Sequence, residues 1–302
     1  MGTEGGRRAD GGGRTEMENA VNDAGAGAQA LTATVIAVGP PGRLDDPAAT
    51  LGQLTSTAAI RGILIRYGTH AEPPTRTSER FVTLDGLRPE YINNAVAALR
   101  LSSLPSIVWW RGGDEADLEG LAALADRIIL DVEEPLPVWR AAVPLVERTS
   151  LGDLRWTRLT RWRALMAHFF DIAEVRAAAP LFHRLDITGA DLPAAGLFAA
   201  WLTGALQTSE RMHVDLQRTT GAPIQRIRVG NGREELMLEL APNGTCVHTA
   251  AHVEGHARAH RTVSLGDQST TALLAEELRI RSRDAAFEAA LRRVVEARSD
   301  ET

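Results

Sequence analysis

The chain has 302 residues, of which 44% are hydrophobic and 24% are charged, with a net charge of −6 and a pI near 5.8. That length is enough for two domains, each with a sizeable hydrophobic core. The acidic balance argues against a general nucleic-acid binder or a binder of anionic membranes, because both need a basic surface.

All 33 basic residues are arginine. The lack of lysine excludes a Walker-type phosphate loop and a Schiff-base lysine, so an anion must meet arginine, a helix N-terminus or backbone amides. The lone cysteine, Cys246, cannot form an intrachain disulfide, which suits a reducing cytoplasm. No apolar run approaches the roughly 20 residues that span a bilayer. We therefore expect a cytoplasmic protein without a membrane partner.

The first half of the chain predicts an α/β domain. Residues 1–30 hold almost no large apolar side chains and are expected to form a disordered tail. A βαβ unit over residues 106–132 implies a parallel sheet with a right-handed crossover. We expect a mostly parallel sheet with flanking helices over residues 31–150. The predicted strands are 31–38, 61–67, 80–84, 106–110 and 127–132, and the predicted helices are 47–59, 89–101 and 114–125, with Asp46 capping the first and a polar loop at 69–78.

The second half predicts an α+β domain over residues 151–302. Helices are expected from Thr160, as cap, to about Ala178, and again over 191–206, with a short strand at 184–188 between them. Period-two segments separated by Asn-Gly and Glu-Gly turns then indicate antiparallel hairpins. These segments are 224–229, 234–240, 245–252 and 258–265, and two amphipathic helices, 269–280 and 283–297, follow them.

The most specific stretch is Asp153–Arg163, which packs four arginines and two tryptophans into eleven residues. Arginine beside tryptophan provides cation–π stacking and planar recognition of carboxylate or phosphate. The stretch is either a partner-binding or anion-binding site, or an interdomain latch in which Asp153 pairs with an arginine. The candidate residues are Arg155, Trp156, Arg158, Arg161, Trp162 and Arg163.

Three further residues are secondary candidates. Trp109 and Trp110 share a strand, so their indoles point to opposite faces and either fill the core on both faces or leave one indole lining a cleft. Asp131 lies near the C-terminal end of a strand, where open α/β sheets bind ligands, although a turn-forming aspartate is an equally good interpretation.

Four histidines recur at every fourth position, which on a helix would form a metal-binding ladder. Their β-branched neighbours favour strands instead, and we expect solvent-facing histidines and no metal. They are His248, His252, His256 and His260. Since neither a GxGxxG nor a GxSxG motif is present, the sequence predicts no cofactor and no catalytic set.

Three motifs resemble the glucose-6-phosphate dehydrogenase assembly protein family, OpcA. They are Asp153-Leu-x-Trp-Thr-Arg-Leu-Thr-x-Trp-Arg163, Leu104-Pro-x-x-Val-Trp-Trp110 and Ala125-Asp-Arg-Ile-Ile-Leu-Asp131, and the likeness covers roughly residues 80–300. The resemblance implies a non-enzymatic partner that assembles or allosterically activates glucose-6-phosphate dehydrogenase in the oxidative pentose phosphate pathway. The rival hypothesis is a binding module or sensor for a phosphorylated metabolite, such as a sugar-phosphate effector, held by the arginines.

Overall fold

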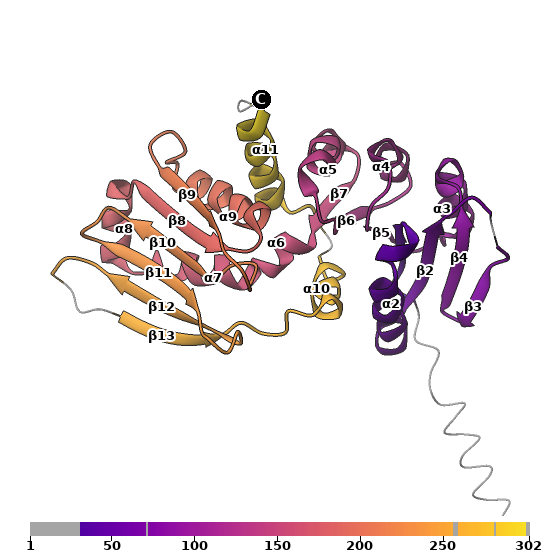
Figure 1. Ribbon diagram of the computed structural model, residues 1–302, viewed down its shortest axis with the longest axis horizontal. Coiled ribbons are helices and arrows are strands. Elements are labelled where there is room, and N and C mark those ends of the chain that lie inside the picture. The colour runs from indigo at the N-terminus through magenta and orange to yellow at the C-terminus, as the bar shows by residue number, and fades with distance from the viewer. Residues whose placement is uncertain (1–30, 71, 256–258, 281, 300–302) are drawn as a thin grey trace, which may run out of the picture.

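The computed structural model describes residues 31–70, 72–255, 259–280 and 282–299, so the tail predicted at 1–30 lies outside the described residues. The described chain forms two β-sheets that lie side by side along the long axis of the molecule, with α6, α10 and α11 between them (Figure 1). Sheet A has the order β3-β4-β2-β1-β5-β6-β7, and sheet B has the order β13-β12-β11-β10-β8-β9. The predicted combination of a mostly parallel and a mostly antiparallel sheet, each with helices, is confirmed.

Sheet A is parallel except for its edge strand β3, which runs antiparallel to β4. Its strands are β1 Ala33–Gly39, β2 Ile60–Tyr67, β3 Thr75–Ser78, β4 Phe81–Leu87, β5 Ser106–Trp110, β6 Arg127–Leu130 and β7 Ser150–Asp153. Its helices are α2 Asp45–Thr57, α3 Ile92–Leu99, α4 Glu115–Ala122 and α5 Pro135–Ala142, with 3-10 turns η1 Pro41–Arg43, η2 Pro89–Tyr91 and η3 Val143–Glu147.

The parallel strands follow the order 3-2-1-4-5-6 when numbered along the chain, which is the order of dinucleotide-binding sheets. Strands buried on both faces read as continuous apolar runs, and every residue of β1 and β5 is buried. Both Trp109 and Trp110 are fully buried, each in a different hydrophobic cluster, which confirms the core on both faces. The crevice that binds ligands in such sheets lies beyond the carboxyl ends of β1 and β5.

Sheet B is built from a βαβ unit followed by an antiparallel meander. Its strands are β8 Arg184–Gly189, β9 His213–Arg218, β10 Arg226–Gly230, β11 Glu235–Leu240, β12 Cys246–His252 and β13 Ala259–Ser264. The helices of this half are α6 Leu154–Arg158, α7 Thr160–Phe169, α8 Ala173–Ala178, α9 Leu192–Ala205, α10 Thr270–Glu277 and α11 Ala285–Ser299, with the 3-10 turn η4 Ala179–Leu181.

Several local predictions were wrong. Helix α2 begins two residues early, and its N-cap is Leu44 with no side-chain bond, so Asp46 is not the cap. The loop predicted at 69–78 contains β3, and β7 and β9 were not predicted. The helix predicted from Thr160 to Ala178 is two helices, α7 and α8, and Leu159 takes the N-cap position of α7.

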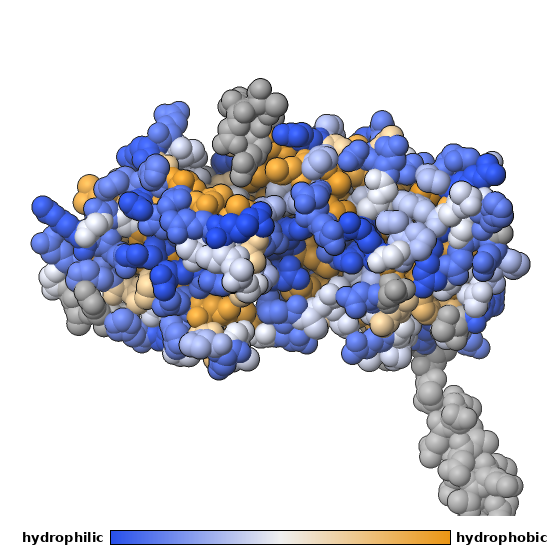
Figure 2. Space-filling view, viewed as in Figure 1, coloured by the Kyte–Doolittle hydropathy of each residue, from blue (hydrophilic) through white to orange (hydrophobic). Residues whose placement is uncertain are grey.

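The two faces of sheet B differ in polarity. Leu185, Ile187 and Ile227 are buried, whereas Arg226 and Arg228 on alternate positions are exposed, as expected for an antiparallel sheet with one solvated face. Figure 2 shows this solvated side as largely hydrophilic over the strands of sheet B. On the other face, α7 packs on β11 and α9 packs on β8 and β9.

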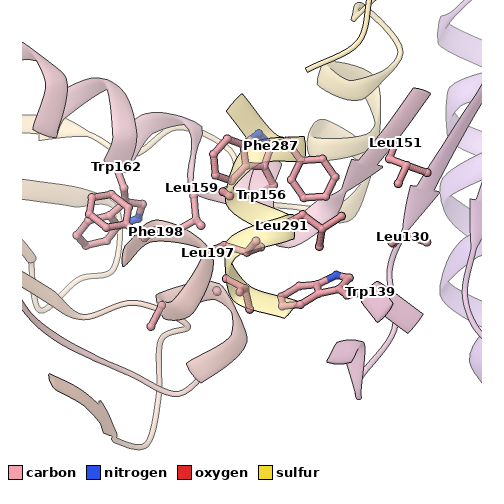
Figure 3. Packing of buried hydrophobic residues seen from close by; sticks show 14 of the residues in the cluster. Leu130, Trp139, Leu151, Trp156, Leu159, Trp162, Leu197, Phe198, Phe287 and Leu291 are labelled. Carbon is pink, nitrogen blue, oxygen red and sulfur yellow. The ribbon is translucent and has the colours of Figure 1, made fainter. Parts of the chain in front are cut away.

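The C-terminal helices join the two halves. Helix α11 packs against α9 and also against α5, while α10 packs against α6 and α2. A continuous hydrophobic cluster runs from sheet A through Trp139 and Trp156 to Phe198 beside sheet B (Figure 3). The segment that enters α6 therefore lies where the two halves meet.

Candidate functional site

Asp153 anchors the Arg/Trp cluster, by which we mean residues 153–163. Its Oδ1 accepts a bond of 2.7 Å from the Arg155 amide and so caps α6, and its Oδ2 accepts one of 2.8 Å from Trp139 Nε1. Asp153 is completely buried. Burial raises the pKa of this carboxyl to about 6, although the Arg155 charge and the Trp139 bond oppose the rise. The predicted pairing of Asp153 with an arginine is therefore a capping bond to the Arg155 backbone.

Arg155 connects sheet A to sheet B. Its Nε donates to the Asp191 carboxylate at 2.9 Å, at the start of α9. Its Nη1 and Nη2 donate to the carbonyls of Val132 and Glu133, at 2.5 and 3.0 Å, in the loop after β6. Only 12% of this side chain is exposed. Every nitrogen of the guanidinium thus donates to an acceptor within the protein, so this arginine serves the fold and not a planar external anion.

Trp156 and Arg163 stack on each other. The Arg163 guanidinium carbon lies 3.5 Å from the centroid of the Trp156 ring, a cation–π contact. Trp156 is buried, its Nε1 donates to Asp284 Oδ2 at 2.7 Å, and its ring packs on Phe287 at a centroid distance of 5.6 Å (Figure 3). Burial lowers the pKa of Arg163 to about 10, against the opposing charge of Asp284. This stack ties α6 and α7 to the start of α11.

A buried ion pair lies beneath the cluster. Arg127, on β6, donates from Nη2 and Nε to Glu277 Oε2 at 2.6 and 3.1 Å. The other oxygen of Glu277 accepts from the Thr157 hydroxyl at 2.5 Å. The two charged side chains are 5% and 1% exposed. The last residue of α10 is thus bound to both β6 and α6.

The remaining members of the cluster face outward or toward a pocket. Arg158 and Trp162 line a pocket of about 300 Å³, to which Arg155 also contributes. Arg161 is exposed. Within the described part of the chain, neither Arg158 nor Arg161 has a hydrogen-bond or ion-pair partner. The six predicted residues therefore do not form one surface. Arg155, Trp156, Trp162 and Arg163 point into the protein, whereas Arg158 is half-buried at the pocket and Arg161 is exposed.

The crevice beyond β1 and β5 is occupied by the chain itself. Arg111 Nη1 pairs with Asp131, and Arg111 Nε donates to the Arg43 carbonyl at 3.3 Å. Asp131 also accepts from Trp109 Nε1 at 3.1 Å. Arg43 in turn pairs with Glu133 at 2.9 Å. Asp131 lies at the predicted edge of the sheet, but its carboxylate is engaged by the protein's own donors.

The loop after β1 also lacks the features that bind a pyrophosphate. Pro40 and Pro41 follow Gly39 and have no backbone N–H to donate, and Asp46 puts an acid in the first turn of α2. Dinucleotide-binding loops use free amides and a helix N-terminus at this position. The crevice therefore has the strand order of a nucleotide site without its donor set.

The three histidines of this group that the structure describes lie on strands, as predicted. His248 is on β12, and its Nδ1 is 3.0 Å from Thr262 Oγ1 on β13. His252 ends β12, His260 pairs in register with Ala250, and His256 lies outside the described residues. Among the residues that the structure describes, no group of three or more His, Cys, Asp or Glu side chains could hold a metal ion.

The acids that engage the cluster were missed by the sequence analysis. The sequence separation is 36 residues between Asp191 and Arg155, 120 between Glu277 and Thr157, and 128 between Asp284 and Trp156. Two of them lie in the late segments Leu274-x-x-Glu-Leu278 and Arg283-Asp284, which also resemble the OpcA family, but neither segment indicates its partner. No described helix is long and apolar enough to cross a membrane.

Comparison with known proteins identifies relatives of this chain. A family model that describes the C-terminal domain of a glucose-6-phosphate dehydrogenase subunit matches residues 149–291. A Nostoc punctiforme protein named as the OxPP cycle protein OpcA is 30% identical over 174 residues, which cover 53% of this chain and 37% of that protein. A Synechocystis protein of the same name is 30% identical over 138 residues, which cover 42% and 29%. The match thus spans about a third of these relatives' length.

Among solved structures, aldose-aldose oxidoreductase from Caulobacter crescentus is similar to this chain with a TM-score of 0.49 and 12% identity, over 91% of this chain and 99% of that one. A levoglucosan dehydrogenase gives the same TM-score with 9% identity, over 89% and 90%. Similarity at this level supports no conclusion about activity.

Proposed function

We propose that the chain is a member of the OpcA family, as its motifs predicted, and that it is a non-enzymatic factor that binds glucose-6-phosphate dehydrogenase and promotes its assembly or its active state. The observation that carries the proposal is the match over residues 149–291, which contains the whole Arg/Trp cluster and sheet B. The proposal places this action in the cytoplasm, within the oxidative pentose phosphate pathway that the relatives' names point to.

The occupied crevice of sheet A supports a role other than nucleotide chemistry. Arg111 and Asp131 pair with each other at the position where a dinucleotide would lie in a sheet of this strand order. A bound cofactor would have to break this pair and the Arg43–Glu133 pair beside it. A partner protein that acts through its surface needs neither change.

We further propose that the Arg/Trp cluster is a latch that holds the partner-binding surface in shape. Its support is that Arg155 and Trp156 each contact an element from another part of the fold, while Arg163 stacks on Trp156. An activator can shift its partner only by binding the active form more tightly than the inactive one, and a tenfold shift requires about 1.4 kcal/mol of differential affinity. A rigid surface keeps that difference from being lost to reordering on binding.

The test is to mix the purified chain with glucose-6-phosphate dehydrogenase from the same organism and to measure the oligomeric state by sedimentation and the initial rate at subsaturating substrate. The proposal predicts a complex, together with a change in the oligomeric state or the kinetics of the dehydrogenase. Unchanged sedimentation and kinetics at saturating chain would refute it.

Two variants separate a latch from a direct partner site. Arg155→Met removes an inward-facing arginine, and Arg161→Glu reverses the charge of an exposed one. A latch predicts that Arg155→Met lowers both the thermal stability and the affinity for the dehydrogenase. A direct contact predicts instead that Arg161→Glu lowers the affinity and leaves the stability unchanged.

A further inference from the structure

A pocket of about 300 Å³ lies beside the Arg/Trp cluster, at the end of sheet B. It is enclosed by the α6–α7 junction, the first turn of α9, the loop before β10 and the turn between β11 and β12. Apolar side chains form most of its wall, among them Leu159, Trp162, Ile224 and Leu240. A concave, mostly apolar site with a few polar groups is the usual form of a small-molecule site.

Two arginines contribute to the wall, and they differ in their bonding. Arg155 is engaged by Asp191 and by two backbone carbonyls. Arg158 is half-buried and has no acceptor in the described part of the chain. A guanidinium that is partly withdrawn from water is destabilised unless an anion pairs with it.

Gln268 provides an independent observation at the same pocket. Its Nε2 donates to the Leu265 carbonyl at 3.2 Å, but its Oε1 is buried and has no hydrogen-bond partner among the residues that the structure describes. Buried polar atoms are almost always satisfied, so the unpaired acceptor of a residue that lines the pocket points to a donor that the amide meets when it turns toward the pocket. The pocket therefore offers one cation and one acceptor on an apolar background.

The Ala194 amide at the start of α9 does not compete for the anion. Ala194 N already donates to Asp191 Oδ1 at 3.0 Å, and Asp191 is itself paired with Arg155. A negative group that enters the pocket would consequently be held by Arg158 and not by the helix N-terminus.

We propose that this pocket binds a small organic anion. Its carboxylate or phosphate pairs with Arg158, its ring or apolar body packs on Trp162 and Leu159, and a hydroxyl or amine donates to Gln268 Oε1 once the amide has turned toward the pocket. A second hollow of about 570 Å³ shares Ala222, Leu240 and Gly244 with the pocket and gives room for a polar extension of the ligand. Thr219 lines that hollow, and its buried Oγ1 has no hydrogen-bond partner among the described residues.

The inference goes beyond the proposed function and is tested on the chain alone, so a failed interaction with the dehydrogenase does not decide it. Phenyl phosphate and benzoate share one apolar ring and differ in their anion, glucose 6-phosphate represents a sugar phosphate, and benzyl alcohol is the neutral control. Isothermal titration calorimetry with the full chain is expected to detect at least one of the three anions and to show weaker or absent binding of benzyl alcohol.

Arg158→Gln should weaken that binding by about 10- to 100-fold, the range expected for one charge-assisted hydrogen bond. Arg161→Gln is the matched control, because Arg161 is exposed and does not line the pocket, and it should leave affinity unchanged. Ala222→Phe, which fills the shared wall from a half-buried position, should abolish binding while circular dichroism remains native.

The same titrations identify the ligand class. Preference for phenyl phosphate over benzoate assigns a phosphate, the reverse assigns a carboxylate, and tighter binding of glucose 6-phosphate assigns a sugar phosphate that uses the second hollow. Three results would overturn the proposal: no binding of any anion at millimolar concentration, binding of benzyl alcohol as tight as that of benzoate, or equal losses in Arg158→Gln and Arg161→Gln.

Discussion

The buried pair between Arg127 and Glu277 provides the sharpest test of how the two halves are joined. It links β6 to the end of α10, 150 residues away along the chain. We consider the single changes Arg127→Met and Glu277→Met and the double change. Each single change leaves the opposite charge without its partner in a site where the two side chains are only 5% and 1% exposed.

The size of the effect follows from that burial. Removing one member of a buried ion pair costs about 3–5 kcal/mol, because the remaining charge stays desolvated. The double change removes both charges and leaves apolar groups of similar length, so its cost should fall below the sum of the two single costs by at least about 2 kcal/mol. An exposed pair serves as the control: Arg148 and Glu119 are 45% and 74% exposed, so Arg148→Met should cost less than about 1 kcal/mol.

The assay is urea unfolding, followed in parallel by tryptophan fluorescence and far-ultraviolet circular dichroism. Coincident transitions by the two probes would justify a single free energy of unfolding for each variant. Additive single costs, or single costs as small as that of Arg148→Met, would show that this pair does not hold the joint and would refute the reasoning.

Three further predictions concern the same joint. A Cβ on Gly152 would overlap Glu277 Oε2, so Gly152→Ala should cost about 1–3 kcal/mol by urea unfolding, whereas Gly52→Ala in α2, with nothing within 4 Å, should cost nothing. Burial raises the pKa of Asp153 from 3.8 to about 6, so the protonated form of this carboxyl stabilises the folded protein. That contribution is complete below pH 3.8, and about 3 kcal/mol is lost as the pH rises through 6. Asp153→Asn should flatten this part of the curve of stability against pH, and an unchanged curve would contradict the assignment. Arg155→Met breaks the bonds to Asp191 and to two carbonyls and should lower the free energy of unfolding by about 2–3 kcal/mol, with a loss below 1 kcal/mol counting against a joint at this residue.

The prediction of sheet A was correct for the strands that are buried on both faces, because their sequences are continuous apolar runs. β1 and β5 are fully buried and were predicted to within two residues. β3, Thr75–Ser78, is a short polar edge strand, so its sequence is that of a loop. β7, Ser150–Asp153, contains Gly152 and one large apolar residue, and its strand state depends on pairing with β6 and on room for the Arg127–Glu277 pair. Neither condition can be predicted from the local strand propensity of the segment.

The Arg/Trp cluster could be located from the sequence, but its orientation could not. Arginine beside tryptophan in a short segment marks a place where charge meets a buried surface. Whether the guanidinium meets an internal acid or an external anion depends on residues far along the chain. Asp191 and Asp284 supply those acids through the tertiary fold. One motif therefore contains both structural arginines and two, Arg158 and Arg161, that have no partner among the described residues, with no local feature to separate them.

The proximity of Arg155 and Arg158 connects the joint with the pocket. The two side chains lie three residues apart on α6 and both line the 300 Å³ pocket, while Arg155 also holds the loop after β6 through Val132 and Glu133. An anion on Arg158 adds a negative charge beside Arg155 and thereby changes how strongly Arg155 binds those carbonyls. Coupling of this kind is reciprocal in free energy, so a partner that favours one geometry of the joint must change the affinity of the pocket by the same factor. A family factor that shifts the state of a dehydrogenase would acquire metabolite sensitivity in this way, without a separate regulatory domain.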